Sequence, residues 1–331
     1  MREKTVAVVG ATGLVGGKML EILEARDFPV SRLIPVASPK SAGREISFRG
    51  EKHRVQPISP EVFKGVDIAL FSAGGETSKR FAPLAAKAGA VVVDNSSAWR
   101  MHEKVPLVVP EVNPEDIEGH SGIIANPNCS TIQMVVALAP LADTFGIESV
   151  TVSTYQGVTG SGVKGVRQLR GELAGKPVAE PAYPHPIAFN CLPHIDVFEE
   201  DGFTREERKM INETRKILDL PDLPVNPTCV RVPVIGGHSE SVQVVLGETV
   251  YLERVRTVLK DAPGLVLLDD PSRNLYPTPL AAHEKDEVFV GRLRVDPTNP
   301  NGLNMWVVSD NLRKGAATNA VQIAELLLEK D

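Results

Sequence analysis

Short apolar runs separated by polar, glycine-rich turns dominate the first half of the chain. The β-branched run at residues 5–9 predicts a buried parallel strand, and a glycine-rich turn at 10–16 and a helical pattern at 17–25 follow it. The same alternation continues, with strands predicted at 33–37, 66–71, 90–93 and 122–125 and helices at 76–88 and 132–141. Strands that alternate with helices predict a doubly wound parallel sheet.

The pattern changes near residue 149. Residues 150–155 alternate between apolar and polar, which is typical of a strand with one solvated or interface face. Further strands are predicted at 229–234 and up to Leu246, and helices at 204–218 and 314–328. Thr204 and Glu207 have the spacing of a capping box at the start of the first of these helices. We therefore expect a mixed sheet in the second half.

These patterns predict an α/β protein of two domains. The first is a Rossmann-like domain at 1–128, joined by a C-terminal helical segment at 311–331. The second is an α+β catalytic domain at 129–310. A proline-rich connection at 176–196 is long for a compact domain, and such loops are usually functional or part of an interface.

Composition excludes several classes of protein. The net charge is −6 and no Lys/Arg-rich block occurs, so a nucleic-acid-binding surface is not expected. No apolar run approaches the ~18–20 residues that span a bilayer, and no signal peptide precedes the first strand. The three cysteines have no CxxC spacing, which predicts neither disulfides nor a metal site and fits a reducing cytoplasm.

The glycine-rich turn is a candidate cofactor site. Gly10, Gly13 and Gly16 follow the first strand directly, with the spacing G-x-x-G-x-x-G. Glycines let a backbone approach a pyrophosphate, and the helix N-terminus offers N–H donors to it. The alternative is an ordinary turn, but the position after the first strand favours dinucleotide binding.

The residues after the second strand favour NADP over NAD. An NAD enzyme usually carries Asp or Glu there, which binds the ribose 2′-hydroxyl. This chain has Ser38, Lys40 and Ser41 instead, and hydroxyls and an ammonium attract a 2′-phosphate. The alternative is a solvated polar turn.

Cys129 is the candidate nucleophile, because it lies where the strand at 122–125 ends and a helix begins. The N–H groups and dipole at a helix N-terminus stabilise a thiolate and an oxyanion formed beside it. The alternative is a small buried hydrophobic residue, but the neighbouring Asn, Pro, Ser and Thr residues are unlike a core. Arg100, in a polar loop, is a candidate for binding an anionic substrate, although a lone arginine is more often a surface charge.

An ordered set of motifs resembles the aspartate-semialdehyde dehydrogenase family over essentially the whole chain. The motifs are GATGLVG, SPKSAG, NSSAWR, NPNCST, TYQ, REERK, CVRVPV, GHSES and SDNLRKGA. The resemblance implies NADPH-dependent reduction of L-aspartyl-4-phosphate to L-aspartate-4-semialdehyde and phosphate through a cysteine thioester. This is a step in lysine, threonine and methionine biosynthesis.

The resemblance also implies roles for individual residues. Cys129 is the nucleophile, His238 the acid/base group and Gln156 the residue that orients the substrate. Arg231 and Glu206 hold the α-carboxylate and α-amine, and Arg100, Asn128 and Lys209 form the phosphate site. The implied cofactor contacts are Gly10, Thr12, Gly13, Leu14, Val15, Ser38, Lys40, Ser41, Ser161, Gly162 and Asn311.

Two other functions remain open at this stage. N-acetyl-γ-glutamyl-phosphate reductase also uses a cysteine and a nicotinamide cofactor. The amine of its substrate is acylated and uncharged, so its site would not need a carboxylate such as Glu206. A non-catalytic, cofactor-binding relative is expected to have lost Cys129 or His238, and both are present. By analogy with the family, we expect a homodimer or homotetramer.

Overall fold

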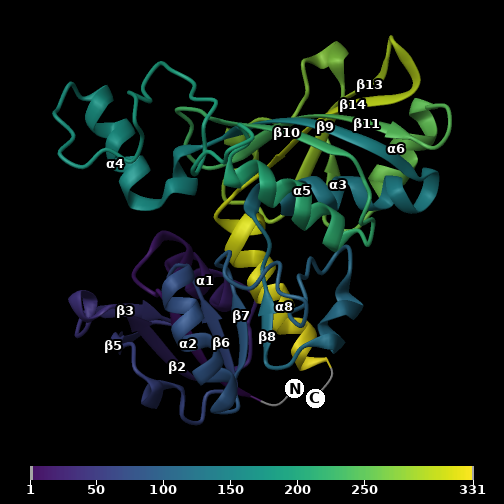
Figure 1. The fold of residues 1–331 in the computed structure, drawn as a ribbon. Coiled ribbons are helices and arrows are strands. Elements are labelled where there is room, and N and C mark those ends of the chain that lie inside the picture. The colour runs from purple at the N-terminus through teal and green to yellow at the C-terminus, as the bar shows by residue number, and fades with distance from the viewer. Residues whose placement is uncertain (1–2, 330–331) are drawn as a thin grey trace. The chain divides into compact units, whose positions relative to one another are not determined.

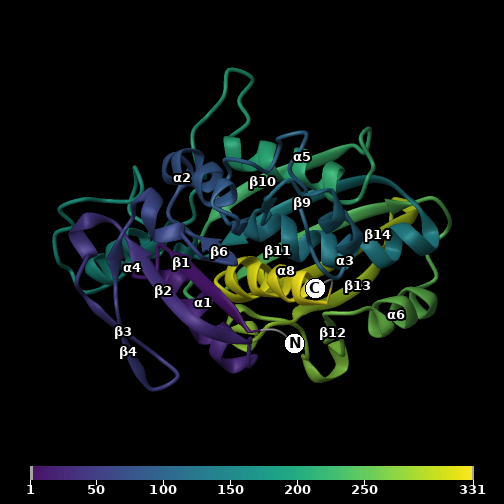
Figure 2. The same cartoon turned by 90° about the horizontal axis from the view of Figure 1, so that it is seen from below.

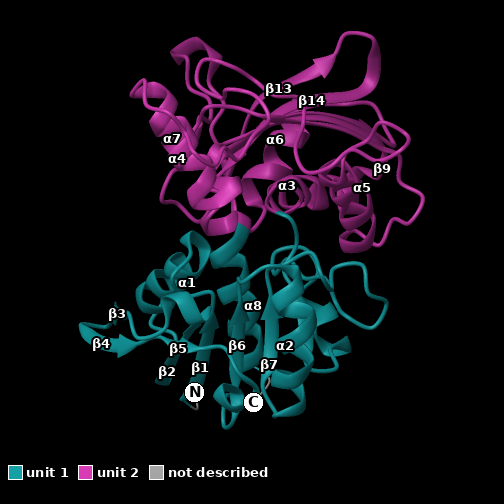
Figure 3. Ribbon diagram, turned by 60° about the vertical axis from the view of Figure 1, so that its left-hand side comes forward, with its two compact units in different colours: residues 1–128, 316–331 teal, residues 129–315 magenta. Residues whose placement is uncertain are grey.

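The computed structural model describes residues 3–329, and these divide into two compact units (Figure 3). The first unit comprises residues 1–128 and 316–331, and the second comprises residues 129–315. Each unit has its own six-stranded sheet. Within residues 3–329, no helix is both long enough and apolar enough to cross a lipid bilayer.

The sheet of the first unit is entirely parallel, with the order β5-β2-β1-β6-β7-β8 (Figure 1). Its strands are β1 (Lys4–Val9), β2 (Val30–Ala37), β5 (Gln56–Pro57), β6 (Ile68–Phe71), β7 (Val91–Asp94) and β8 (Ile123–Ala125). The chain runs outward in one direction from β1 to β5 and in the other from β6 to β8. The sheet therefore has a topological switch point between β1 and β6, where ligands bind in open α/β sheets.

Helices cover both faces of this sheet. α1 (Leu14–Ala25) packs against α8 (Thr318–Leu328), and their side chains share one core cluster with β1 and β6 (Figure 2). α2 (Gly75–Lys87) contacts β6, β7 and β8. Right-handed crossovers place α2 on the face opposite α1. A hairpin that the hydrophobic pattern did not predict, β3 (Glu45–Phe48) and β4 (Glu51–Arg54), follows β2.

The sheet of the second unit is mixed, with the order β10-β9-β11-β14-β13-β12. Its strands are β9 (Ile147–Gln156), β10 (Val225–Arg231), β11 (His238–Leu246), β12 (Leu265–Leu267), β13 (Val288–Asp296) and β14 (Asn299–Ser309). The outer pairs β10–β9 and β12–β13 are parallel, and the inner pairs are antiparallel. The predicted fold class, a doubly wound parallel sheet plus a mixed sheet, is thus confirmed.

One face of the mixed sheet is covered by α3 (Cys129–Phe145), α5 (Arg205–Ile217) and α6 (Leu252–Asp261). The other face keeps partly exposed side chains, among them Tyr155 and Trp306, whose rings lie 5.4 Å apart. The remaining helices are α4 (Gly162–Leu173) and the short α7 (Pro279–Ala282), and a π-helical turn (Arg313–Ala317) precedes α8.

Local predictions were mostly confirmed. The capping box of α5 is present: the Glu207 N–H donates to Thr204 Oγ1 at 3.3 Å, and the Thr204 N–H donates to Glu207 Oε2 at 2.7 Å. α3 is longer than predicted and continues through Pro140. Proline has no N–H, so one backbone hydrogen bond of α3 is missing at Pro140. Most residues of α3 are buried, and their packing stabilises the helix despite this loss. The strand predicted at 229–234 instead ends at Arg231, because Pro233 has no N–H for a ladder.

Two adjacent glycines of α1 provide a matched test of the close approach between α1 and the turn after β1. A β-carbon on Gly16 would lie 2.1 Å from the Gly10 carbonyl oxygen, whereas one on Gly17 would meet nothing within 4 Å. We expect Gly16→Ala to destabilise the protein by about 1–3 kcal/mol and weaken cofactor binding. Gly17→Ala should be neutral or stabilising by up to about 1 kcal/mol. Urea denaturation and cofactor titration of both variants check this; equal effects of the two would contradict it.

Candidate active site

Three predicted site residues lie side by side at neighbouring strand ends of the second unit. In the strand register, Gln156 at the end of β9 is opposite both Arg231 of β10 and His238 of β11. All three side chains are buried. We call these three residues the strand-end cluster. Sequence places them far apart, and only the order of the strands brings them together.

A second layer of polar side chains fixes Gln156. Its Nε2 donates to Glu206 Oε1 at 3.0 Å, and its Oε1 accepts from Thr154 Oγ1 at 2.9 Å. Glu206 in turn accepts from Lys209 at 3.0 Å on the same face of α5. Burial alone lowers the pKa of Lys209, but Glu206 and Asp196 offset this and raise it above its usual value. Lys209 is therefore a cation at neutral pH.

One residue, Gly157, orients two members of the strand-end cluster, Arg231 and His238. Its carbonyl oxygen accepts from Arg231 Nη1 at 2.7 Å, and its N–H donates to His238 Nδ1 at 3.0 Å. A histidine that accepts at Nδ1 carries its proton on Nε2 when neutral. Within residues 3–329, neither His238 Nε2 nor Arg231 Nε has a hydrogen-bond partner. Two buried polar atoms are thus left for a ligand.

Gly160 packs closely against Arg231 and His238, where a side chain would not fit. A β-carbon there would lie 2.7 Å from Arg231 Nη1 and 3.2 Å from His238 Nε2. The sequence does not distinguish Gly160 from the other residues of the loop at 157–162. Its only signal was membership of that glycine-rich loop. Asp196, which pairs with Lys209 at 2.8 Å, was also missed, because nothing in its local sequence distinguishes it.

Cys129 is the first residue of α3 and is half-buried. Gly315 lies beside it: a β-carbon on Gly315 would be 2.9 Å from Cys129 Cβ and 3.6 Å from Asn311 Cβ. Asn311 accepts a hydrogen bond from Thr159 Oγ1 at 2.8 Å, in the loop that contains Gly160. Ser161 and Gly162 end this loop at the start of α4. The second unit therefore gathers Cys129, Asn311 and the loop next to the strand-end cluster.

The other two cysteines differ from Cys129. Cys229 is fully buried on β10, and its Sγ lies 3.6 Å from Met210 Sδ. Burial and then Glu206 raise the pKa of the Cys229 thiol far above its usual value. Cys191 is exposed in the proline-rich connection. Of the three, only Cys129 lies at a helix N-terminus, where a thiolate is stabilised.

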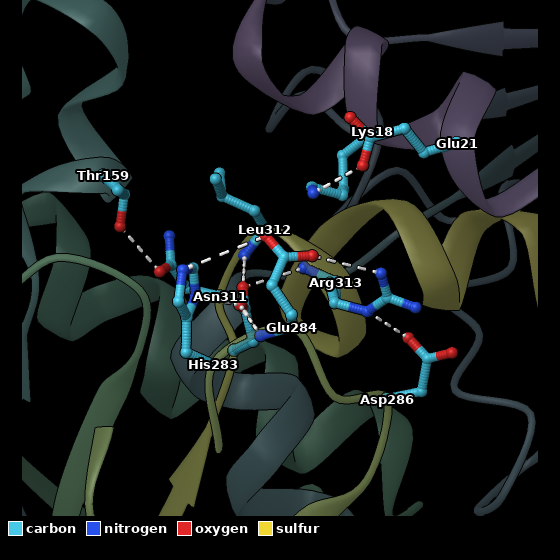
Figure 4. A network of polar contacts seen from close by, with 10 residues as sticks. Lys18, Glu21, Thr159, His283, Glu284, Asp286, Asn311, Leu312 and Arg313 are labelled. Carbon is cyan, nitrogen blue, oxygen red and sulfur yellow. Dashed lines mark hydrogen bonds and ion pairs between the residues drawn. The ribbon is translucent and has the colours of Figure 1, made fainter. Parts of the chain in front are cut away.

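An acidic network holds the turn that carries Asn311 (Figure 4). Asp310 Oδ1 accepts from the N–H groups of Leu312 and Arg313, and Oδ2 accepts from the Glu284 N–H at 2.9 Å. His283 Nδ1 also lies 2.9 Å from Asp310 Oδ2. His283, Glu284 and Asp310 are close enough to hold a metal ion, but backbone donors already use both oxygens of Asp310. The network therefore shapes the turn.

The glycine-rich turn at residues 10–16 of the first unit has no room for a side chain at its first residue. Gly10 has a φ of +91°, and a β-carbon there would lie 2.1 Å from the Ser72 carbonyl oxygen at the end of β6. The turn lies at the switch point between β1 and β6, and Gly13 precedes the first residue of α1. Thr12, Leu14 and Val15 belong to the same turn. The N–H groups at this helix start fit a dinucleotide pyrophosphate.

Ser38, Lys40 and Ser41 lie just after β2, next to this turn in the sheet order. The N–H of Gly10 donates to the Val36 carbonyl oxygen at 2.8 Å, which ties the glycine turn to β2. Ser38 and Lys40 are exposed, and Ser41 is partly buried. The first unit thus brings together the residues predicted for the pyrophosphate and for the 2′-phosphate.

Arg100 is buried, in contrast to an ordinary surface arginine. Its Nε donates to the Asn126 carbonyl oxygen at 2.9 Å, and its Nη2 donates to the Asn95 carbonyl oxygen at 3.0 Å. Asn128 is also buried. It is the last residue of the stretch 1–128 that belongs to the first unit. Backbone carbonyls therefore set the orientation of the Arg100 guanidinium.

Comparisons with known proteins identify the family. Residues 5–120 match the model of the semialdehyde dehydrogenase NAD-binding domain, and residues 138–314 match that of the semialdehyde dehydrogenase dimerisation domain. The chain is 56% identical over 333 residues to aspartate-semialdehyde dehydrogenase of Aquifex aeolicus, with 98% of each chain covered. This chain belongs to the aspartate-semialdehyde dehydrogenase family.

Solved structures agree with this assignment. Aspartate semialdehyde dehydrogenase II from Vibrio cholerae, complexed with ASA, has a TM-score of 0.96 at 49% identity, with 99% of each chain covered. The enzyme from Candida albicans, solved with NADP, has a TM-score of 0.78 at 27% identity, again covering 99% of each chain. The family resemblance is confirmed, and the chain is an oxidoreductase of amino-acid biosynthesis that uses a nicotinamide cofactor.

The family's reaction is the reduction of L-aspartyl-4-phosphate to L-aspartate-4-semialdehyde and phosphate. The alternative, an N-acetyl-γ-glutamyl-phosphate reductase, is not favoured by these comparisons.

The buried state of His238 predicts a pH dependence of stability. Burial, and secondly Arg231, lowers its pKa from the ordinary 6.5 to about 3. As pH falls below 6.5, the unfolded chain binds a proton that the native state does not, so this contribution to stability decreases until about pH 3. His238→Asn should therefore show a shallower loss of unfolding free energy between pH 6.5 and 4.5, by about 1.4 kcal/mol per pH unit. Urea denaturation across this range measures both slopes; parallel slopes would contradict the assignment.

Proposed function

We propose that Cys129 is the nucleophile of this reaction and that the strand-end cluster holds the substrate next to it. The observation that supports this most strongly is a pair of buried atoms on neighbouring strand ends, His238 Nε2 and Arg231 Nε, which have no hydrogen-bond partner within residues 3–329. A polar ligand is needed to satisfy them. Gln156, held at both ends of its amide, lies between them in the strand register.

The chemistry follows from these groups. The Cys129 thiolate attacks the carbonyl carbon of the acyl phosphate, and the C–O bond to phosphate breaks to leave a thioester. The N–H groups at the start of α3 stabilise the oxyanion of this step. A bound nicotinamide supplies the hydride that reduces the thioester. His238 acts as the acid/base group through Nε2: its N–H donates a hydrogen bond to the resulting alkoxide and shares the proton with it, and the proton stays on the imidazole as the carbon–sulfur bond breaks, the aldehyde forms and the Cys129 thiolate leaves.

The charges of the substrate match the remaining residues. Arg231 binds the α-carboxylate in fork geometry, and Glu206 binds the α-amine. Lys209, Arg100 and Asn128 bind the phosphate group, for which two cations are suited. The pairing of Lys209 with Asp196 and Glu206 keeps its ammonium in place before the substrate arrives.

The cofactor is NADP rather than NAD. Ser38, Lys40 and Ser41 offer hydroxyls and an ammonium, with no carboxylate among them, at the position that contacts the ribose. The Candida albicans relative, solved with NADP, is consistent with this. The glycine turn holds the pyrophosphate through Gly10, Thr12, Gly13, Leu14 and Val15, and Ser161, Gly162 and Asn311 contact the nicotinamide end.

The protein is a homodimer or a homotetramer, and the open face of the mixed sheet is the contact surface. The second unit matches a dimerisation domain, and its sheet carries helices α3, α5 and α6 on one face only. Tyr155 and Trp306 on the other face form a partly exposed aromatic pair. Such residues are enriched at protein interfaces. Three free cysteines agree with a reducing, cytoplasmic location.

Replacing the nucleophile tests the mechanism. Cys129→Ala should abolish the phosphate-dependent oxidation of aspartate semialdehyde while NADPH binding stays near normal, because the glycine turn is untouched. Cys191→Ala, at an exposed cysteine, is the matched control and should retain full activity. Absorbance at 340 nm and fluorescence titration measure the two properties. Substantial activity in Cys129→Ala would rule out the thioester route.

The cofactor preference has its own test. Ser38→Asp places a carboxylate where the 2′-phosphate is proposed to bind, and charge repulsion should lower kcat/KM for NADP by about 10-fold or more. The value for NAD should stay within about twofold, because NAD lacks that phosphate. Ser47→Asp, exposed on β3, is the control. Equal losses with both cofactors would argue against a 2′-phosphate site here.

A further inference from the structure

Three asparagine side chains, Asn95, Asn126 and Asn319, lie close to Arg100 in the first unit and take no part in the chemistry described above. Asn95 directly follows β7 and Asn126 directly follows β8, and these two parallel strands are neighbours in the sheet. The carboxyl ends of the strands therefore bring the first two amides together. Asn319 comes from α8, near the other end of the chain. Asn126 and Asn319 are completely buried.

Hydrogen bonds join the three amides in series. Asn319 Nδ2 donates to Asn126 Oδ1 at 2.7 Å and to the Val108 carbonyl oxygen at 3.0 Å. Asn126 Nδ2 donates to Asn95 Oδ1 at 2.6 Å and to the Ala316 carbonyl oxygen at 3.3 Å. Because a carbonyl oxygen can only accept, Val108 and Ala316 fix which way round each amide lies. The amide of Asn126 is thus held at both ends.

The backbone of the same two loop residues holds Arg100. Its Nε donates to the Asn126 carbonyl oxygen at 2.9 Å, and its Nη2 donates to the Asn95 carbonyl oxygen at 3.0 Å. The two carbonyl oxygens therefore determine the plane in which the rigid guanidinium lies. The side-chain bond between Asn126 and Asn95 keeps these carbonyls in place relative to each other, and Asn319 keeps Asn126 in place.

We propose that Asn319 is a positioning residue of the phosphate site: through Asn126 and Asn95 it holds the guanidinium of Arg100 in the orientation that binds the phosphate group. This inference rests on the phosphate-binding role proposed for Arg100. Orientation matters because the donors of an arginine lie in one plane and bind a phosphate in fork geometry. A rotated guanidinium keeps its charge but loses the paired hydrogen bonds. The C-terminal helix α8 thus helps to form a site whose other residues come from much earlier in the chain.

Removing the amide of Asn319 tests this role. In the phosphate-dependent oxidation of aspartate semialdehyde, Asn319→Ala should raise KM for phosphate by about 10-fold, because the guanidinium loses its orientation. The value of kcat at saturating phosphate should stay within about threefold and KM for NADP within about twofold, whereas a general loss of structure would lower kcat as well. The matched control is Gln322→Ala, one turn further along α8. Gln322 Nε2 donates to Glu111 Oε1 at 2.9 Å, and its loss should leave KM for phosphate and kcat unchanged.

A double-mutant cycle separates positioning from general stability. Arg100→Met removes the guanidinium and should raise KM for phosphate by about 10-fold or more. Because Asn319 acts through Arg100, adding Asn319→Ala to Arg100→Met should raise this KM no further, so the two effects are not additive. If Asn319→Ala folds poorly, Asn126→Ala takes its place. That variant removes the amide but keeps the backbone carbonyl that accepts from Arg100.

Phosphate binding is also measured without turnover. The melting temperature of the full-length protein is recorded against the concentration of inorganic phosphate at constant ionic strength, because a ligand that binds the native state raises it. Wild type and Gln322→Ala should show the same saturable rise, and Asn319→Ala should need about 10-fold more phosphate for it. The rise that Arg100→Met retains measures the non-specific effect of the salt.

Three results would overturn the proposal. If phosphate binding were lost in Arg100→Met but normal in Asn319→Ala and Asn126→Ala, the amides would position nothing, and the phosphate site would stand. Additive losses in the double-mutant cycle would mean that Asn319 does not act through Arg100. Normal phosphate binding in Arg100→Met would defeat the proposed role of Arg100 together with this inference. The melting assay needs no turnover, so it decides the role of Asn319 even if the protein proved inactive towards aspartate semialdehyde.

Discussion

The geometry of the strand-end cluster depends on one backbone residue, Gly157, which holds two side chains at once. Its carbonyl accepts from Arg231 and its N–H donates to His238, so a single peptide segment fixes the guanidinium and the imidazole relative to each other. A β-carbon on Gly157 would lie 2.7 Å from the carbonyl oxygens of both Val234 and Gly237. Only glycine permits this approach, because any side chain would separate the loop from the strand ends.

The same physical constraint operates at the cofactor turn. Gly10 passes close to the end of β6, and Gly16 passes close to Gly10, so backbone atoms occupy the space of the missing side chains. In both units, a glycine directly after a strand therefore lets backbone groups come close to one another. In the second unit, the polar side chains of Thr154 and Glu206 then orient Gln156.

Family membership and local geometry support each other in this protein. The comparisons identify an aspartate-semialdehyde dehydrogenase, and the structure explains how a mixed sheet can present the charges that such a substrate needs. Arg231, on β10, bonds to Gly157, whereas Lys209 and Glu206, on α5, are linked to Gln156; because Gln156 and Gly157 are adjacent in the chain, the three charged side chains are held by one short segment.

Sequence alone determined the local elements and the residue types of the site. The β-branched run of β1, the glycine turn, the capping box of Thr204 and Glu207, and the start of a helix at Cys129 all follow from neighbours in the chain, because propensity, capping and turn geometry are local. The pairings of β9 with β10 and β11 and the close approach of Gly160 to Arg231 and His238 were decided only by the tertiary structure. Strand order and close packing join residues that are distant in sequence, and no local pattern encodes which strand ends will meet.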